Sequence, residues 1–408
     1  MIDILLQRAG KEEGIWLMVV SLRDFKQVND MFGQQVGDSF LKEISSFLCE
    51  VAPKDSVYRF NGDEFAILYD KSQKEDVERC VQTISDRMEA VWEAGEYRCF
   101  LSAVIGVVEK TENNQTIESM IQSVEYAVAE AKKRKDNSIY YCDEKMLEEM
   151  ERKKKIIQIL KDKLKDGNFE MYYQPIYAVS AKKFLYAESL IRMNDTPIGP
   201  IYPSEFIPIA EETGIIIEMT YLILDKVCKF VKKILEEEIE IQSVHVNFSA
   251  IQFSQIDLEN KVIEIIKQNG IPSSSIKIEF TESAIAESTE VVTNFAVAMR
   301  REGIKMGLDD FGIGYSNIAT VLNIPFNAVK LDKSLVWAAM KDKKSTLAIK
   351  NLIQVFRELG MQVVAEGVET EEQRQLVCDF GVAQIQGYYF SKPLPEKEAI
   401  QFLKENNK

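Results

Sequence analysis

Acidic side chains recur in the second half of the sequence, each after a short apolar run. They form one set with a single amide: Glu188, Asn247, Glu279, Asp309, Asp310 and Glu366. The set contains no histidine or cysteine, so all its donors are oxygen atoms, which favours Mg²⁺ or Mn²⁺. Because Asp309 and Asp310 are adjacent, one carboxylate could bridge two ions, as in phosphodiester cleavage. Lys330 could orient or deprotonate an attacking water, or neutralise charge on phosphorus.

The apolar runs themselves predict the elements that position this chemistry. Each run is read as a strand that ends in a polar residue: Tyr172-Tyr173 before Gln174, Phe184–Ala187 before Glu188, Val244–Val246 before Asn247, Ile276–Ile278 before Glu279, Lys305–Leu308 before Asp309, Ala328-Val329 before Lys330, Val363–Ala365 before Glu366, and Ala383–Ile385 before Gln386. About eight strands with helices between them predict an α/β fold, a (β/α)₈ TIM-like barrel over residues 166–408. The carboxyl ends of such strands converge on one mouth, so we expect these residues to share a pocket.

Residues 1–142 predict a smaller, separate α/β unit. Its expected elements are a buried strand at Trp16–Val20, a hairpin of Val57–Phe60 and Phe65–Tyr69 about Asn61-Gly62, a helix at Lys74–Trp92, and a strand at Tyr97–Val108. Residues 143–165 are charged, with apolar residues at helical spacing, and predict a connecting helix between the two units.

Composition excludes several kinds of protein. The 408 residues carry 50 Lys and Arg against 65 Asp and Glu, a formal charge of −15, which excludes a nucleic-acid-tracking protein. The only histidine, His245, excludes a His-based metal site and is expected to be buried and structural. Six scattered cysteines suggest free thiols in a reducing cytoplasm. With no apolar run of spanning length, we expect a cytoplasmic chain, or the soluble part of a larger membrane-anchored protein.

The second half of the chain resembles the EAL domain family of cyclic-di-GMP phosphodiesterases. The matching motifs follow one another in order: Tyr173-Gln174-Pro175-Ile176, Glu188-Ser189-Leu190-Ile191-Arg192, Asn247-Phe248-Ser249-Ala250, Glu279-Phe280-Thr281-Glu282, Asp309-Asp310-Phe311-Gly312, Lys330-Leu331-Asp332, Ala365-Glu366-Gly367-Val368-Glu369 and Gln386-Gly387-Tyr388. The resemblance implies metal-dependent hydrolysis of cyclic di-GMP to the linear dinucleotide pGpG, and a homodimer formed through the barrel domain.

The resemblance also implies a role for each matching residue. One metal site would comprise Glu188, Asn247, Glu279 and Asp309, and a second would comprise Asp309, Asp310 and Glu366. The implied catalytic residues are Lys330, Glu366, Gln386, Glu282 and Asp332, with Lys330 beside the attacking water and Glu282 holding the loop after Asp310. Gln174, Leu190 and Arg192 would contact the substrate.

Two positions depart from the family's pattern. The signature Glu-Ala-Leu is Glu188-Ser189-Leu190 here, and the usual Thr of the loop after Asp310 is Ile313. Neither change removes a ligand, so the sequence favours an active enzyme. The alternative is a non-catalytic receptor that binds cyclic di-GMP and acts through protein partners, with turnover blocked by Ile313.

The first half resembles the GGDEF domain family of diguanylate cyclases, in degenerate form. The signature is Arg59-Phe60-Asn61-Gly62-Asp63-Glu64-Phe65, with Asn61 in place of the first Gly. The family's metal-binding Asp is Ser21 here, and the next acidic position is Arg23. This leaves Asp63 as the expected side-chain ligand and argues against cyclase activity and against a bifunctional enzyme. The retained residues Asn29, Asp38, Asp63 and Lys132 leave open a GTP site that regulates the barrel.

Overall fold

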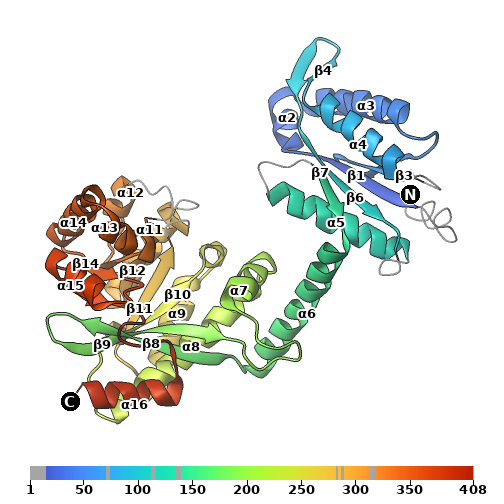
Figure 1. Cartoon of the computed structure of the whole chain (residues 1–408). Coiled ribbons are helices and arrows are strands. Elements are labelled where there is room, and N and C mark those ends of the chain that lie inside the picture. Colours follow the sequence, from blue (N-terminus) through green and yellow to red (C-terminus); the bar gives the residue numbers. More distant parts are fainter. Residues whose placement is uncertain are drawn as a thin grey trace. The chain divides into compact units, whose positions relative to one another are not determined.

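The computed structural model describes residues 15–69, 74–111, 116–133, 139–281, 284–285, 289–312 and 318–407. The chain divides into two compact units, Met1–Lys155 and Ile156–Lys408 (Figure 1). The division falls within helix α6 (Glu144–Asp166), which occupies the segment expected to connect the two units. None of the described helices has the length and apolar character needed to cross a membrane.

The N-terminal unit is built on a five-stranded sheet with the order β2-β3-β1-β6-β7. Its elements are β1 (Trp16–Leu22), α2 (Phe25–Phe32), α3 (Gln34–Val51), β2 (Val57–Asn61), β3 (Glu64–Tyr69), α4 (Lys74–Met88), β4 (Val91–Ala94), β5 (Tyr97–Phe100), β6 (Ala103–Glu109), α5 (Ile117–Lys133) and β7 (Ile139–Cys142). The central strand β1 is buried along its whole length and pairs antiparallel with β3 and β6. The predicted hairpin about Asn61-Gly62 is confirmed as β2 and β3.

Two boundaries predicted in this unit are wrong. The helix expected over Lys74–Trp92 ends at Met88, and the strand expected over Tyr97–Val108 is two strands, β5 and β6. β4 and β5 form a separate hairpin between α4 and β6, and Trp92 of β4 is buried against Phe47 of α3. The turn is made by Gly95 in the left-handed region, at φ 63°.

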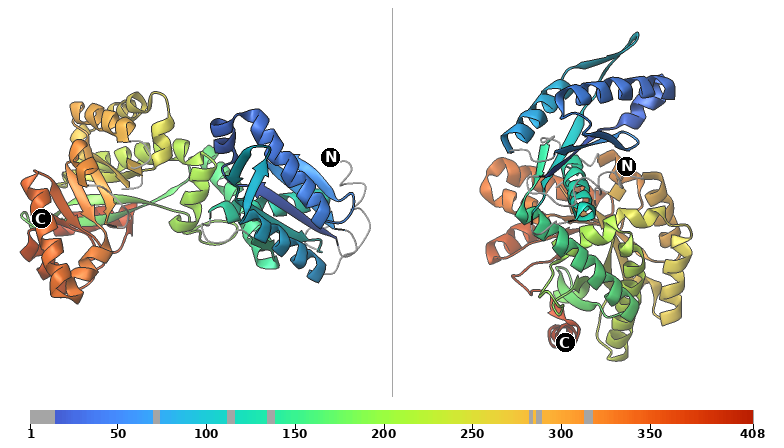
Figure 2. Two further views of the ribbon diagram at one scale, coloured as in Figure 1. Left: turned by 90° about the horizontal axis from the view of Figure 1, so that it is seen from above. Right: turned by 90° about the vertical axis from the view of Figure 1, so that its right-hand side faces the viewer.

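The C-terminal unit is an eight-stranded barrel with helices on its outside (Figures 1 and 2). Its elements are β8 (Glu170–Ala178), β9 (Lys183–Arg192), α7 (Pro203–Glu212), α8 (Ile215–Glu236), β10 (Ser243–Phe248), η2 (Ala250–Ser254), α9 (Leu258–Asn269), η3 (Ser273–Ser275), β11 (Ile276–Thr281), α11 (Thr289–Arg301), β12 (Lys305–Phe311), α12 (Ile318–Asn323), β13 (Ala328–Leu331), α13 (Lys333–Lys341), α14 (Lys343–Glu358), β14 (Gln362–Ala365), α15 (Glu371–Phe380), β15 (Gln384–Ile385), β16 (Leu394–Pro395) and α16 (Glu396–Asn406). The predicted TIM-like barrel is confirmed.

One strand of the barrel departs from the all-parallel pattern. Strands β9 to β15 run parallel in sequence order, whereas β8 closes the barrel by pairing antiparallel with both β9 and β15. Gln174 therefore lies in the middle of β8, and not at a strand end as predicted, but the register places it directly opposite Glu188. Tyr173 stacks on Phe230 of α8, with ring centroids 3.5 Å apart, so period-two alternation turns its neighbour Gln174 toward the inside of the barrel.

Candidate active site

A buried lysine at the barrel mouth is surrounded by four carboxylates. Lys330 Nζ lies 2.7 Å from Glu366 Oε1, 3.0 Å from Asp309 Oδ1, 3.1 Å from Glu279 Oε2 and 3.3 Å from Glu188 Oε2. The four acids lie on β9, β11 and β12 and just after β14, so separate strands deliver them to one point. The predicted convergence of the acidic strand ends is therefore present in the structure.

The charges of this cluster do not balance. Burial, assisted by the neighbouring carboxylates and opposed by Lys330, raises the pKa of Asp309 to about 7. Burial likewise raises the pKa of Glu366 well above its usual range. Burial alone would lower the pKa of Lys330, but the surrounding carboxylates raise it well above its usual range. One ammonium thus faces four acids, an arrangement that attracts further cations.

The carboxylates form two groups that could each hold a metal ion. Glu188, Glu279 and Asp309 make up the first group, and Asp309, Asp310 and Glu366 make up the second. Within each group the available oxygen atoms all lie within 4.8 Å of one another, and Asp309 belongs to both groups. The donors are all carboxylate oxygens, so the residues fit a hard divalent cation such as Mg²⁺ or Mn²⁺.

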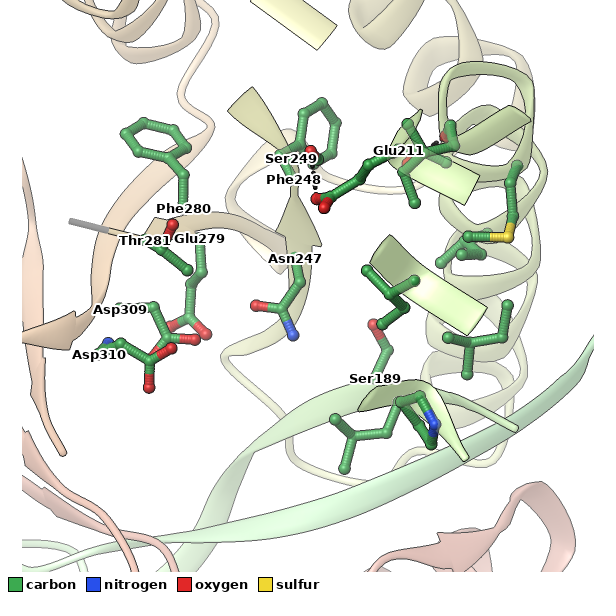
Figure 3. Close-up of a pocket in the computed structure, with 18 of the residues that line it drawn as sticks. Ser189, Glu211, Asn247, Phe248, Ser249, Glu279, Phe280, Thr281, Asp309 and Asp310 are labelled. Atoms are coloured by element: carbon green, nitrogen blue, oxygen red, sulfur yellow. Dashed lines mark hydrogen bonds between the residues drawn. The ribbon is translucent and has the colours of Figure 1, made fainter. Parts of the chain in front are cut away.

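A backbone irregularity allows neighbouring aspartates to serve the same mouth. Successive residues of a regular strand face opposite sides of a sheet, which would separate Asp309 from Asp310. The pairing of β12 with β13 shifts register between Leu308 and Phe311, and Asp310 has a left-handed φ of 55°. Its backbone N–H donates to Asp309 Oδ1 at 2.9 Å. Figure 3 shows both carboxylates beside Glu279, so a conformation that costs roughly 1–2 kcal/mol brings them together.

Asn247 adjoins the first group through its side-chain amide. Its Nδ2 donates to Glu188 Oε1 at 2.7 Å, and Figure 3 shows the side chain facing Glu279 and the aspartates across the pocket. Rotation of this amide about its last bond would present the oxygen in place of the nitrogen. Its position is compatible with the predicted role as a ligand.

Two glutamines connect the far side of the barrel to the acids. Gln386 Nε2 donates to Glu188 Oε2 at 2.6 Å and to Gln174 Oε1 at 3.0 Å. Gln174 Nε2 in turn donates to the backbone oxygen of Ser391 at 3.0 Å. Both side chains line the same pocket as Lys330 and Glu366, together with Asp332. Asp332 also begins helix α13, where its Oδ1 accepts a hydrogen bond from the N–H of Ser334 at 2.8 Å.

A second pocket opens beside the acids and is lined largely by apolar side chains. Leu190, Asp309 and Asp310 line both pockets, and Arg192 lies at the second. The guanidinium carbon of Arg192 is 5.6 Å from the centre of the Tyr172 ring, and its Nη1 donates to the backbone oxygen of Ile191 at 2.8 Å. The predicted substrate-contacting residues Gln174, Leu190 and Arg192 thus all border the acidic cluster.

Ser189, the changed residue of the Glu-Ser-Leu signature, lies in the wall of this second pocket. Its Oγ donates to the backbone oxygen of His245 at 2.7 Å, inside the barrel wall. The serine thereby ties β9 to β10 and leaves Glu188 facing Lys330. Glu282 and Ile313, the other predicted positions near the loop after Asp310, lie outside the described residues.

Sequence reasoning missed a buried lysine near Glu279 and a contact between Glu279 and the buried histidine. His245 is buried as expected, but its Nδ1 also lies 2.9 Å from Glu279 Oε1. Burial lowers the pKa of His245 to about 4, with Glu279 acting in the opposite direction. Lys277, two residues before Glu279, has no exposed surface, and burial lowers its pKa to about 8. A lysine inside an otherwise apolar strand, at even spacing from Glu279, was the signal that could have found it.

The N-terminal unit holds a different arrangement around Ser21. Ser21 Oγ donates to Glu64 Oε1 at 2.8 Å, and Lys132 Nζ lies 3.4 Å from the same oxygen. The register pairs Ser21 with Glu64, so Glu64, and not the predicted Asp63, faces this position. The guanidinium of Arg23 donates to the backbone oxygens of Ala131 and Lys132 at 3.0 and 3.4 Å, at the end of α5.

The remaining residues of the expected GTP site lie on α2 and α3 of the same unit. Asn29 packs closely on Gly37, where a Cβ would lie 2.0 Å from Asn29 Oδ1, and Asp38 follows Gly37 as an exposed residue. Asp24, the acid nearest to Ser21 along the chain, lies off the strand at φ 50° and immediately precedes α2. Among the described residues, no group of metal-ligating side chains forms around Ser21.

The fold and site define an α/β barrel with an acidic, oxygen-donor centre at its mouth. The chain belongs to the EAL domain family, whose model matches residues 157–393. The model described as "Diguanylate cyclase, GGDEF domain" matches residues 1–138, so the two domains stand in tandem.

Curated proteins match almost the whole chain, and a solved structure matches part of it. The chain is 25% identical over 385 residues to the "Bifunctional diguanylate cyclase/cyclic di-GMP phosphodiesterase MucR" of Pseudomonas aeruginosa, covering 94% of this chain and 56% of that protein. It is 27% identical over 393 residues to the "Cyclic di-GMP phosphodiesterase NbdA" of the same organism, covering 96% and 50%. The structure "PaMucR Phosphodiesterase, c-di-GMP complex" matches with 26% identity and a TM-score of 0.57, over 60% of this chain and 99% of that one. The chain spans about half the length of the curated relatives it matches.

Proposed function

We propose that the barrel hydrolyses cyclic di-GMP to linear pGpG with the help of two divalent metal ions. The observation that carries the proposal is the pair of carboxylate groups that share Asp309 beside Lys330. The names of relatives that act on cyclic di-GMP support the choice of substrate. Glu188, Asn247, Glu279 and Asp309 would hold one ion, and Asp309, Asp310 and Glu366 would hold the other. Ions bound there would generate a hydroxide from water at neutral pH and stabilise charge on the phosphate.

The protein's own residues account for the remaining parts of the reaction. In the metal-free chain the surrounding carboxylates raise the pKa of Lys330, which favours its charged form. As a cation beside the proposed metal sites, Lys330 is suited to orient the attacking water and to neutralise phosphate charge. The amides of Gln386 and Gln174 lie in the same pocket and can donate to water or phosphate oxygens. Arg192 and the apolar pocket beside it are placed to bind a second phosphate and a guanine base.

Turnover of cyclic di-GMP by the full chain tests this proposal. Incubation with Mg²⁺ or Mn²⁺ should release pGpG, measured by chromatography, and Glu188→Ala should abolish the product because it removes a ligand that also contacts Lys330, Asn247 and Gln386. The receptor alternative gives a different result, namely tight binding of cyclic di-GMP with no product under either metal. That result would refute the proposed hydrolysis.

We further propose that the N-terminal domain does not synthesise cyclic di-GMP. Synthesis from GTP needs carboxylates that hold Mg²⁺ against the triphosphate, and Ser21 and Arg23 occupy the two positions where such acids are expected. Asp63 is left as the expected side-chain ligand, and its neighbour Glu64 already accepts hydrogen bonds from Ser21 and Lys132.

The cyclase test uses the full chain with Asp309→Asn, so that any cyclic product is not destroyed. Incubation with GTP and Mg²⁺ should leave the GTP unchanged for hours. Appearance of cyclic di-GMP would contradict the proposal and would revive the bifunctional alternative.

A further inference from the structure

A layer of polar side chains lies inside the barrel, one step below the carboxylates. Residues two apart on a strand face the same side, so the residues two before Glu188 and Glu279 also point into the barrel. These are Tyr186 and Lys277, and the third buried polar residue of the layer is His245. The layer is continuous, because the rings of Tyr186 and His245 are 6.0 Å apart and Lys277 Nζ is 5.5 Å from the Tyr186 ring centre. Branched apolar side chains usually fill this part of a barrel, so the polar layer needs a reason.

The most unusual member of the layer is Lys277. The residue has no exposed surface, and within the described part of the chain its Nζ has no hydrogen-bond partner. An isolated ammonium in such a place costs several kcal/mol unless negative charge compensates for it. The aromatic face of Tyr186 offers only a weak attraction at 5.5 Å. The compensating charge must therefore come from the carboxylates above.

Gly307 brings the lysine and the carboxylates close together. This glycine on β12 pairs with Glu279 on β11, and a Cβ added to it would lie 3.0 Å from Glu279 Cγ and 3.4 Å from Lys277 Cδ. The side chains of Lys277 and Glu279 therefore both pass Gly307 on the inner wall, in the space left because Gly307 has no side chain. His245, which is the register partner of Lys277 on β10, contacts Glu279 from the other side at 2.9 Å.

We propose that Lys277 is a positioning residue for the metal centre, a fixed positive charge beneath Glu279 that balances part of the carboxylate cluster and weakens its hold on divalent cations. The inference rests on the proposed metal-binding function. In an interior of low effective dielectric constant, a unit charge beneath Glu279 repels a divalent ion held by that carboxylate. The charge of Lys277 thus reduces the repulsion among the carboxylates in the metal-free chain. In the metal-bound chain the same charge allows the ion to dissociate more readily.

Metal affinity of the full chain tests the role of Lys277. Lys277→Met keeps the length of the side chain and removes the charge, so the Kd for Mn²⁺, measured by calorimetry at pH 7, should fall by at least about tenfold. Lys305→Met is the matched control. Lys305 is the register partner of Lys277 on β12 but is partly exposed, so water screens its charge and the Kd should change less than about twofold.

The possible outcomes distinguish a wrong role for Lys277 from a wrong assignment of the metal centre. A wild-type chain that binds no Mn²⁺ would contradict the proposed metal centre. A wild-type chain that binds Mn²⁺, combined with an unchanged or a higher Kd in Lys277→Met, would overturn the role of Lys277 alone. If the variant does not fold without metal, saturating Mn²⁺ should restore its near-ultraviolet circular dichroism, because the ion supplies the missing positive charge. Failure of Mn²⁺ to restore the fold would also overturn the proposal.

Discussion

Asp309→Asn is expected to lower the turnover of cyclic di-GMP by about a thousandfold or more. The reason is that Asp309 belongs to both carboxylate groups and also lies 3.0 Å from Lys330 Nζ. The amide keeps the size of the side chain but removes the charge that would bridge two ions. Calorimetric titration with Mn²⁺ should show loss of binding at both sites, whereas Glu366→Gln should weaken only one.

A matched substitution controls for a general loss of charge. Asp379→Asn makes the same chemical change on the exposed face of α15, where Asp379 accepts a hydrogen bond from Gln375. Its turnover should stay within about twofold of the wild-type value. Comparable turnover in Asp309→Asn and the wild type, with both proteins folded, would rule out a bridging role for Asp309.

Removal of divalent ions is expected to abolish hydrolysis completely and reversibly. Treatment with a chelator should reduce turnover to the background rate, and added Mg²⁺ or Mn²⁺ should restore it. The ions should also raise the Tm of the chain, because they bind the folded cluster and no such site exists in the unfolded chain. Undiminished turnover after exhaustive chelation would show that the chemistry does not depend on the carboxylate groups as ligands.

The same experiment has a predictable dependence on pH. In the metal-free chain the pKa of Asp309 is raised to about 7, above its value of 3.8 in an unfolded chain. The group therefore binds a proton more readily when folded, and its contribution to stability is present at acid pH and lost as the pH rises toward 7. Metal and proton compete for the carboxylate, so the stabilisation by Mn²⁺ should be small near pH 5 and should grow as the pH rises.

Most of the site could be predicted because it depends on strand ends. The period of the apolar runs fixed the barrel, and a barrel directs the ends of its parallel strands to one mouth. Asp309, Lys330 and Glu366 lie close to strand ends as predicted, and Glu279 lies two residues before the end of β11. The end predicted for the strand before Glu188 is wrong, because β9 continues to Arg192. Gln174 lies beside the same residues although it is in the middle of β8, because β8 runs antiparallel to its neighbours and pairs Gln174 with Glu188.

The remaining features depended on registers and packing that no periodicity encodes. Alternation alone would place Asp309 and Asp310 on opposite faces, and only the shift between Leu308 and Phe311 brings them together. The pairing of Ser21 with Glu64 depends on the register of β1 against β3, which the hairpin motif did not determine. The spacing of Lys277 from Glu279 can be read in the sequence, but the room that Gly307 leaves for its side chain depends on the register of β11 against β12.

In the proposed function, water attacks a phosphodiester of cyclic di-GMP at the carboxylate cluster. The most direct measurement is the mass of the product formed with Mn²⁺ in water enriched in ¹⁸O. Hydrolysis predicts linear pGpG that carries one ¹⁸O atom in its terminal phosphate, and no such product from Asp309→Asn. Intact cyclic di-GMP that remains bound to the wild-type chain, with no labelled product after many hours, would contradict the proposed function.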